Sequence, residues 1–112
     1  MCIRDRTGND DNALEFNKRG GVGAIGVTAN IAAKLSSDFQ KACKNDMAEA
    51  VKLDKILQPL HSSLFIESNP SPVKYAASLL KMCSPSVRLP LVEIRDETKK
   101  KVSDALKSAK LL

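Results

Sequence analysis

Residues 20–30 read GGVGAIGVTAN, and this stretch decides the fold. Gly20 suits the position just beyond the end of a helix, because only glycine takes the left-handed backbone conformation there without steric cost. The short apolar run that follows predicts a strand covered on both faces, as in a parallel sheet. Asn30 can cap a following helix, since its side-chain oxygen can accept a hydrogen bond from a free backbone N–H. A helix, a strand and a second helix with tight joints are typical of an α/β fold.

The bulk composition predicts one small domain. The chain has 112 residues and a mass of 12.1 kDa, and 43% of its residues are hydrophobic but only 4% are aromatic, so its core must be aliphatic. No run approaches the roughly 20 consecutive apolar residues of a membrane span. Three widely spaced cysteines without a CxxC pattern indicate reduced thiols in a cytoplasmic protein, and no metal site is expected.

The net charge of +5, with an isoelectric point near 9.2, admits two interpretations. A basic protein can bind nucleic acid or a membrane surface, or it can simply carry a solvated, lysine-rich surface. The lysines are interleaved with Asp and Glu along the chain, and aromatic residues for base stacking are nearly absent. We therefore expect neither a nucleic-acid nor a membrane partner.

The start of the chain does not match the pattern that follows it. Residues 1–6, MCIRDR, show neither periodicity nor a helix cap, and we interpret them as a non-native leader. Residues 7–12 are turn-rich and lead into a short helix over residues 13–19, which Asp10 or Asp11 can cap. A parallel strand needs neighbours, but the chain has no room for a strand before residue 7. This shortage leaves two alternatives: the apolar run is an irregular segment and not a strand, or the chain is the C-terminal piece of a larger α/β protein.

The remainder of the chain has helical periodicity, beginning with a helix over residues 31–43. Asp46, with Glu49 three residues later, resembles a capping box at the start of a second helix. Pro59 lies inside that helix and predicts a kink or a local loss of hydrogen bonding.

Two further helices are expected after residue 70. Ser71 and Pro72 are typical of an N-cap and a first helical residue, and a last helix is expected at about residues 96–110. Apolar spacing predicts the buried positions of all four helices, which are Ile31, Leu35, Phe39, Ala42, Cys43, Met47, Ala50, Val51, Leu57, Leu60, Leu64, Val73, Ala76, Ala77, Leu80, Val102, Ala105, Leu106 and Ala109. Cys83 is also expected to be a buried small hydrophobe.

Three stretches together resemble one known family, and they are GGVGAIGVTANIAAKLS, LQPLHSSLFIESNPSPVKYA and VRLPLVEI. The second stretch contains an Asn-Pro-x-Pro-Val-Lys signature at residues 69–74. The resemblance is to the dihydrodipicolinate synthase family and covers about residues 7–112. It implies a (β/α)8 TIM barrel, a fold of about 250 residues, with a small C-terminal helical extension.

On that plan, residues 7–45 form the end of the TIM barrel and residues 46–112 form the C-terminal helical extension. The loop after strand seven, helix seven, strand eight and helix eight then correspond to residues 7–12, 13–19, 23–29 and 31–43. The parent is thus an α/β protein, whereas this fragment, which contains about its last strand and two helices, is mostly α-helical.

The resemblance also implies an activity for the intact enzyme, which condenses pyruvate with L-aspartate semialdehyde in lysine (diaminopimelate) biosynthesis. A lysine on the sixth strand attacks the ketone of pyruvate and forms a Schiff base, and the resulting enamine adds to the aldehyde. That lysine and a proton-relay tyrosine belong upstream of this fragment. The fragment is therefore expected to hold no catalytic residue and to be inactive alone, while the intact enzyme needs no cofactor or metal and forms a homotetramer.

Two residues of this chain correspond to substrate-binding positions of the family. Ile25 matches a residue whose backbone carbonyl lies at the pyruvate site, and Gly8 stands where the backbone approaches that site closely. Asn9 occupies a position that is usually acidic in the family, and Gly26 stands where serine is common. In sheets and barrels of this class, ligands bind at the carboxyl ends of strands, which agrees with a site near residues 27–30.

Two alternatives for the function stay open. The chain resembles, less closely, other pyruvate-dependent class I aldolases of the same family, such as N-acetylneuraminate lyase. A stand-alone basic helical binding module for an anionic partner is the alternative from a different class of protein.

Other residues with reactive side chains have ordinary structural interpretations. Lys74 is expected in the first turn of a helix, solvated or ion-paired, and not as the Schiff-base lysine. His61 is the only histidine, and no triad pattern accompanies it, so a helix-surface or packing role is expected. Asp10 and Asp11 are interpreted as helix caps in preference to an acid–base pair.

Overall fold

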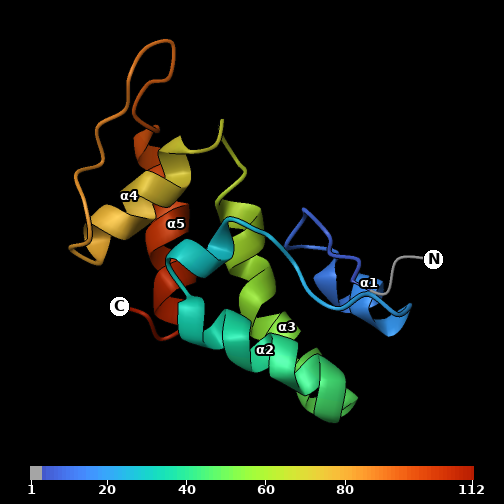
Figure 1. The fold of residues 1–112 in the computed structure, drawn as a ribbon. Helices are drawn as coiled ribbons and strands as arrows, with labels where there is room; N and C mark the ends of the chain where they lie inside the picture. Colours follow the sequence, from blue (N-terminus) through green and yellow to red (C-terminus); the bar gives the residue numbers. More distant parts are fainter. Residues whose placement is uncertain (1–3) are drawn as a thin grey trace.

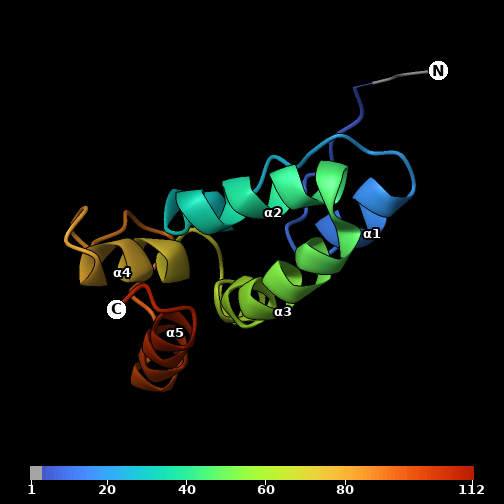
Figure 2. The ribbon, with the colours of Figure 1, turned by 90° about the horizontal axis from the view of Figure 1, so that it is seen from below.

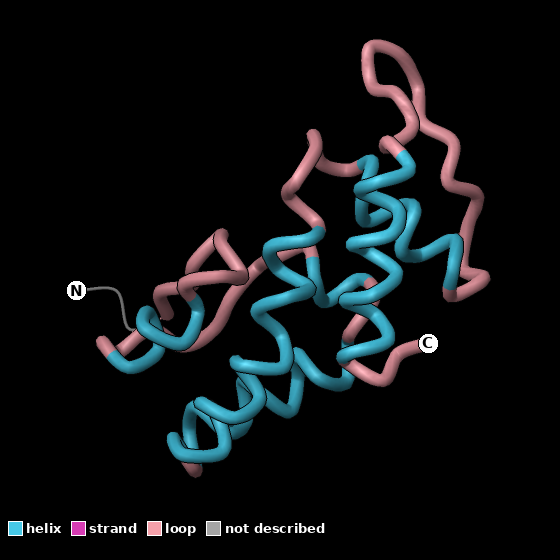
Figure 3. Tube along the Cα trace, turned by 180° about the vertical axis from the view of Figure 1, so that it is seen from behind, coloured by secondary structure: helices cyan, strands magenta, loops and turns pink. Residues whose placement is uncertain are grey.

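A computed structural model describes residues 4–112 of the chain, and residues 1–3, half of the segment interpreted as a leader, lie outside it. Figure 1 shows the arrangement, and Figure 3 draws the described residues as helices joined by loops. The elements in chain order are α1 (Ala13–Lys18), the short 3-10 helix η1 (Thr28–Asn30), α2 (Ala33–Asn45), α3 (Met47–Ser63), α4 (Ser71–Leu79) and α5 (Asp96–Ser108). The expectation of a mostly α-helical chain agrees with this order.

Parallel pairing joins two short extended segments near the start of the chain. Thr7 and Ala24 form a parallel bridge, and the Thr7 N–H donates to the Gly23 carbonyl at 3.1 Å. The pairing extends on both sides, because the Val22 N–H donates to the Asp5 carbonyl and the Ile25 N–H donates to the Thr7 carbonyl, both at 2.9 Å. Residues 5–7 therefore supply the neighbour that the sequence pattern was expected to lack. Part of the segment interpreted as a leader takes part in this pairing.

The predicted strand over residues 23–29 is wrong in its extent. Among residues 4–112 the bridge is isolated, and the extended pairing ends at Ile25. The chain then turns into η1, where the Ala32 N–H donates to the Thr28 carbonyl at 2.9 Å. A longer strand needs ladder partners along its whole length, and the described residues provide only three residues to pair with it.

α1 ends in the way that the double glycine predicts. Gly20 has a φ of +99° and follows the C-cap residue Arg19. Its N–H donates to the Asn17 carbonyl at 3.1 Å, and the Gly21 N–H donates to the Phe16 carbonyl at 3.0 Å. These two bonds form a Schellman motif, which satisfies carbonyls at the helix end and directs the chain back toward the bridge.

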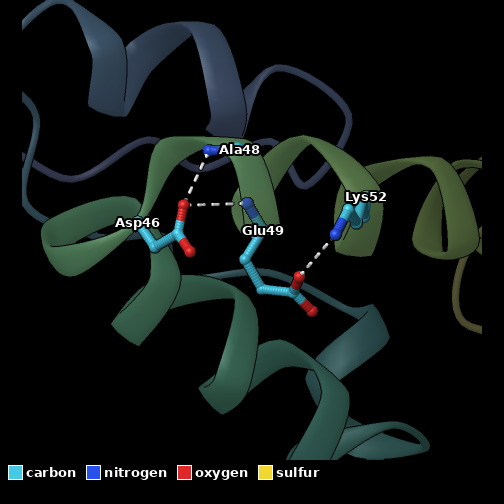
Figure 4. A network of polar contacts seen from close by, with 4 residues as sticks. All are labelled: Asp46, Ala48, Glu49 and Lys52. Atoms are coloured by element: carbon cyan, nitrogen blue, oxygen red, sulfur yellow. Dashed lines mark hydrogen bonds and ion pairs between the residues drawn. The ribbon is translucent and has the colours of Figure 1, made fainter.

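α2 and α3 form an antiparallel pair joined at Asp46, α5 packs against α3, and α4 packs against α5 near η1 (Figure 2). The Asp46 carboxylate accepts the N–H groups of Ala48 and Glu49 at 3.1 and 3.2 Å, which caps α3 (Figure 4). Glu49 does not complete the predicted capping box, because its carboxylate pairs instead with Lys52 at 3.3 Å. Asp46 thus caps the helix as predicted, but Glu49 does not make the reciprocal hydrogen bond back to Asp46.

The predicted apolar stripes make up most of the core. The predicted residues that are buried are Ile31, Phe39, Ala42, Ala50, Leu57, Leu60, Leu64, Val73, Ala76, Val102, Ala105, Leu106 and Ala109. α4 begins at Ser71 with Pro70 as its N-cap, one residue earlier than predicted, and the Ser71 hydroxyl donates to the Val92 carbonyl at 2.9 Å. Cys83 was expected to be buried but is exposed, because it lies beyond α4 in a loop with little packing.

The molecule is elongated and measures 41 × 30 × 21 Å. Its radius of gyration is 14.5 Å, whereas a compact chain of this length has about 13 Å. α1 and the bridge lie at one end, and α4 and α5 lie at the other (Figure 2). Within residues 4–112, no helix is both long enough and apolar enough to cross a membrane.

Candidate functional site

The two loops that leave the parallel bridge meet at one end of it. Because the paired segments run in the same direction, residues 8–12 and residues 26–30 emerge on the same side. The Asp10 carboxylate joins them by accepting the N–H of Val27 at 2.7 Å and that of Thr28 at 3.1 Å. One side-chain oxygen therefore holds the backbone of both loops in a fixed relation.

Asp10 acts as a cap, but not of the helix for which a cap was predicted. α1 begins after Asn12, and no side-chain hydrogen bond caps it. Asp10 instead lies across the bridge at the start of η1, 17 residues away in sequence. The negative charge is well placed there, because the first N–H groups of a helix turn have no partner within it.

Gly26 allows the Asp10 carboxylate to approach the backbone. A Cβ atom at position 26 would overlap the carboxylate group of Asp10. A side chain at residue 26 and the present position of Asp10 are therefore incompatible. This contact is a physical reason for glycine here, where the resemblance led us to expect serine.

The loop of residues 8–12 folds back on Thr7, which is buried. The Thr7 hydroxyl donates to the Asn12 side-chain oxygen at 2.7 Å and accepts the Asn9 N–H at 3.1 Å. Gly8 lies at the tip of this turn and is exposed, and a Cβ atom added to it would meet nothing within 4 Å. The space beside Gly8 is therefore open.

The structure brings the two predicted substrate-binding residues together. The Ile25 N–H donates to the carbonyl of Thr7, the residue directly before Gly8. Ile25 is 73% exposed, and no hydrogen bond among residues 4–112 is accepted by its carbonyl. An exposed glycine backbone and a free carbonyl thus lie side by side at the carboxyl ends of two parallel segments.

Sequence reasoning missed a buried polar pair behind this end of the bridge. Thr28 Oγ1 and His61 Nδ1 share a hydrogen bond of 2.7 Å. Thr28 is 0% exposed and His61 is 6% exposed, so the packing role expected for His61 is correct and the surface role is not. No local pattern could have identified the pair, since its members are 33 residues apart in sequence.

Burial lowers the pKa of His61 below its ordinary value of 6.5. The carboxylates of Asp10, Asp54 and Asp11 oppose this shift, with Asp10 contributing most among them. Burial is the larger effect, because a charged imidazolium would lose its hydration in the interior. The imidazole is therefore neutral at neutral pH and can share a hydrogen bond with a hydroxyl.

Two hollows flank His61. One has a volume of about 270 Å³ and lies between the loop of residues 26–30 and helices α2 and α3. The other, of about 360 Å³, lies between the loop of residues 8–12 and α3, and Gln58 and Phe65 line it. The described part of the chain holds no group of three or more His, Cys, Asp or Glu residues arranged to bind a metal ion.

Lys74 lies away from this site, in the first turns of α4. Its ammonium group donates to the carbonyl of Ser86 in the loop that follows α4. This contact is exposed, which agrees with the predicted solvation, and among residues 4–112 no ion pair of Lys74 is formed.

Comparisons with known proteins match this chain to one family. The sequence profile of the Dihydrodipicolinate synthetase family matches residues 6–109. The 4-hydroxy-tetrahydrodipicolinate synthase of Pelagibacter ubique is 69% identical over an alignment of 110 residues that covers 95% of this chain and 38% of the relative. The enzyme of the same name from Zymomonas mobilis is 56% identical over an alignment of 108 residues that covers 95% of this chain and 37% of the relative. The chain thus spans little more than a third of the length of these relatives.

Solved structures of similar proteins share the arrangement described above. A dihydrodipicolinate synthase from Thermotoga maritima superposes with a TM-score of 0.90 and 33% identity, over 94% of this chain and 36% of the other. The Acinetobacter baumannii enzyme, in a structure complexed with pyruvate, superposes with a TM-score of 0.91 and 34% identity, over 97% of this chain and 38% of the other. The similarity extends over nearly the whole chain.

Proposed function

This chain belongs to the dihydrodipicolinate synthetase family, and from that premise we propose that it supplies the C-terminal third of a lyase that condenses pyruvate with L-aspartate semialdehyde. The intact enzyme forms a Schiff base between pyruvate and a lysine of the upstream part, and this chain contributes one wall of the pyruvate site. The reaction serves lysine biosynthesis through diaminopimelate. The identity of 69% to the Pelagibacter ubique synthase supports this substrate pair over that of N-acetylneuraminate lyase.

One observation carries the proposal. Gly8 and the free carbonyl of Ile25 lie next to each other at the carboxyl ends of two parallel segments, where α/β folds bind their ligands. A carbonyl without a partner at such an end can accept a hydrogen bond from a ligand or orient it, and the neighbouring glycine leaves room for a close approach.

The proposal assigns the segments of the chain to parts of a (β/α)8 barrel. Residues 7–45 form the end of the barrel, with the bridge as a remnant of strands seven and eight, and residues 46–112 form the C-terminal helical extension. We propose further that the intact enzyme works in the cytoplasm as a homotetramer and needs no cofactor beyond its own lysine.

A chimera tests the function directly. The part of the Pelagibacter ubique synthase that precedes the matched region is joined to residues 7–112 of this chain, and condensation of pyruvate with aspartate semialdehyde is assayed. We expect turnover within about tenfold of the Pelagibacter enzyme, because 69% of the aligned residues are identical in the two proteins. A folded chimera that binds pyruvate but does not react with aspartate semialdehyde would refute the proposed substrate pair.

The chain alone provides the complementary experiment. The 112-residue protein is mixed with pyruvate and sodium borohydride, which reduces a Schiff base to a stable amine, and its intact mass is measured. We expect no adduct on the chain alone and one pyruvyl adduct per chimera. A stoichiometric adduct on the chain alone would contradict the assignment of the reactive lysine to the upstream part.

A further inference from the structure

We propose that His61 is a positioning residue for the pyruvate site, which it serves from α3 by holding Thr28 and thereby the turn that carries the Ile25 carbonyl. This inference rests on the proposed function. It gives the helical extension a defined task at the site, although no residue of α3 needs to touch the substrate.

The first step of the argument is the burial of the contact between α3 and the turn. Thr28 Oγ1 and His61 Nδ1 lie 2.7 Å apart, and both residues are almost completely removed from water. Water therefore cannot replace either partner easily when the other is lost. Among residues 4–112 the Thr28–His61 contact is one of two side-chain hydrogen bonds that join α3 to the loops after the bridge, the other being that from Gln58 to the Asp11 carbonyl at 3.0 Å.

The second step is that Thr28 is held from two sides. Its backbone N–H donates to Asp10, and its side chain bonds to His61. Asp10 belongs to the loop that begins with Gly8, whereas His61 belongs to a helix that packs against α2 and α5. The two contacts together fix Thr28 relative to both the loop of residues 8–12 and α3.

The third step links Thr28 to the Ile25 carbonyl. Only Gly26 and Val27 separate these residues, and the Ile25 N–H is fixed by its bond to Thr7. Gly26 is the residue with the greatest backbone freedom in this segment, because it has no Cβ. The direction of the Ile25 carbonyl therefore depends on how firmly the far end of the turn is held, and His61 holds it together with Asp10.

Neutrality of the imidazole supports the same arrangement. A buried neutral ring can share a hydrogen bond with the threonine hydroxyl in either tautomer, whereas a buried cation would have to be desolvated. The lowered pKa of His61 keeps the ring in this state near neutral pH.

Four variants in the chimera separate positioning from simple stabilisation. Thr28→Val removes the hydroxyl without changing the shape, His61→Leu removes the ring nitrogens, and His61→Asn keeps a polar group near the position of Nδ1. Ser63→Ala is the matched control, because Ser63 is also buried on α3 but donates to the Leu60 carbonyl of its own helix at 3.0 Å. Kinetic constants for both substrates and the melting temperature are measured for each variant.

We expect Thr28→Val and His61→Leu each to lower kcat/KM for pyruvate about tenfold, since misplacing a binding group by 1 Å can cost about 100-fold. KM for aspartate semialdehyde should stay within about twofold, and His61→Asn should recover most of the loss. Ser63→Ala should lower the melting temperature without changing KM for pyruvate. Variants that lose stability but keep the wild-type KM for pyruvate would reduce His61 to a packing residue and overturn the inference.

Amide hydrogen exchange in the same chimera gives a readout that does not require activity. In His61→Leu, the amides of Val27 and Thr28 should exchange at least about tenfold faster than in the parent, while Ser63→Ala leaves them unchanged. Unchanged exchange in His61→Leu overturns the inference even where the chimera is active. If the parent chimera is inactive although His61→Leu speeds amide exchange at Val27 and Thr28 as expected, the proposed function is refuted. The role of His61 at a pyruvate site is then refuted with it.

Discussion

At the scale of single residues, His61 couples the stability of the protein to pH. Its pKa in the folded protein lies below 6.5, mainly because the ring is buried against Thr28. At pH values between the lowered pKa of the folded protein and 6.5, the ordinary pKa that applies to the unfolded chain, His61 is protonated in the unfolded chain but not in the folded protein. The free energy of unfolding therefore falls as the pH falls through this window, and the contribution is complete above about pH 7.

The corresponding prediction compares two proteins as the pH changes. The melting temperature of the chimera should fall more steeply between pH 7.5 and 5.5 than that of its His61→Leu variant, which has no group to protonate at this position. Thermal melts at five pH values across this range give the two slopes. Equal slopes would mean that His61 binds its proton equally well in the folded and unfolded states.

Gly26 also shows how one residue determines the geometry around it. The carboxylate of Asp10 occupies the space that a side chain at position 26 would fill, and it uses that position to bind two backbone N–H groups. A glycine within an apolar run looks like a weak point in a strand when the sequence is considered alone. In the structure, the carboxylate of Asp10, from the loop of residues 8–12, lies directly against Gly26.

At the scale of elements, the start of α3 depends on one side chain. Asp46 accepts two backbone N–H groups, and the i, i+3 ion pair between Glu49 and Lys52 is exposed, so it adds little. We expect Asp46→Ala to lower the free energy of unfolding by about 1 kcal/mol, whereas Asp46→Asn stays within about 0.5 kcal/mol, because asparagine is an equally good N-cap. Urea unfolding of the chimera measures the free energy of unfolding of both variants. An equal loss in the two variants would indicate that the charge matters and the cap bonds do not.

α3 also links the two ends of the molecule. It packs against α2 along one side and against α5 along the other, and its residue His61 reaches the turn after the bridge. Apolar packing alone would need only an apolar stripe on α3. The polar contact to Thr28 adds a directional link, because a hydrogen bond depends on geometry where apolar packing does not.

At the scale of the whole molecule, the chain exposes surfaces that suit a larger assembly. Ile25 is 73% exposed directly beside the bridge, and among residues 4–112 the bridge has no further pairing partner. Unpaired edges and exposed apolar groups favour association with other chains. The elongated shape leaves α1 with few contacts beyond α2 and α3.

We therefore expect the isolated 112-residue chain to self-associate or to remain molten, and the chimera to melt cooperatively. Light scattering coupled to size exclusion, together with binding of a hydrophobic dye, compares the two proteins at equal concentration. A monomeric mass and a sharp thermal transition for the isolated chain would contradict this expectation.

The parts of the fold that local interactions control were predictable. The helix over Asp96–Ser108 buries Val102, Ala105 and Leu106 as its spacing predicts, and the Schellman motif at Gly20 needs only residues within the same turn. Helix ends were predicted less well, because Asn30 does not cap α2. Its amide instead donates to the Val27 carbonyl at 2.9 Å within η1. Ile25 and Gly8 were identified from the family resemblance, and their roles in substrate binding stay predictions.

The sequence by itself determined the helical stripes, the turn at Gly20, the cap at Asp46 and the family, because each depends on residues that are close together in the chain or on a pattern of identities. The tertiary structure alone decided that Asp10 caps η1, that residues 5–7 pair with the segment after Gly21, and that His61 bonds to Thr28. These contacts join residues 16 to 33 positions apart. They form only where packing of the helices brings the two partner segments together. A spacing rule that applies within one segment cannot predict a contact between two segments.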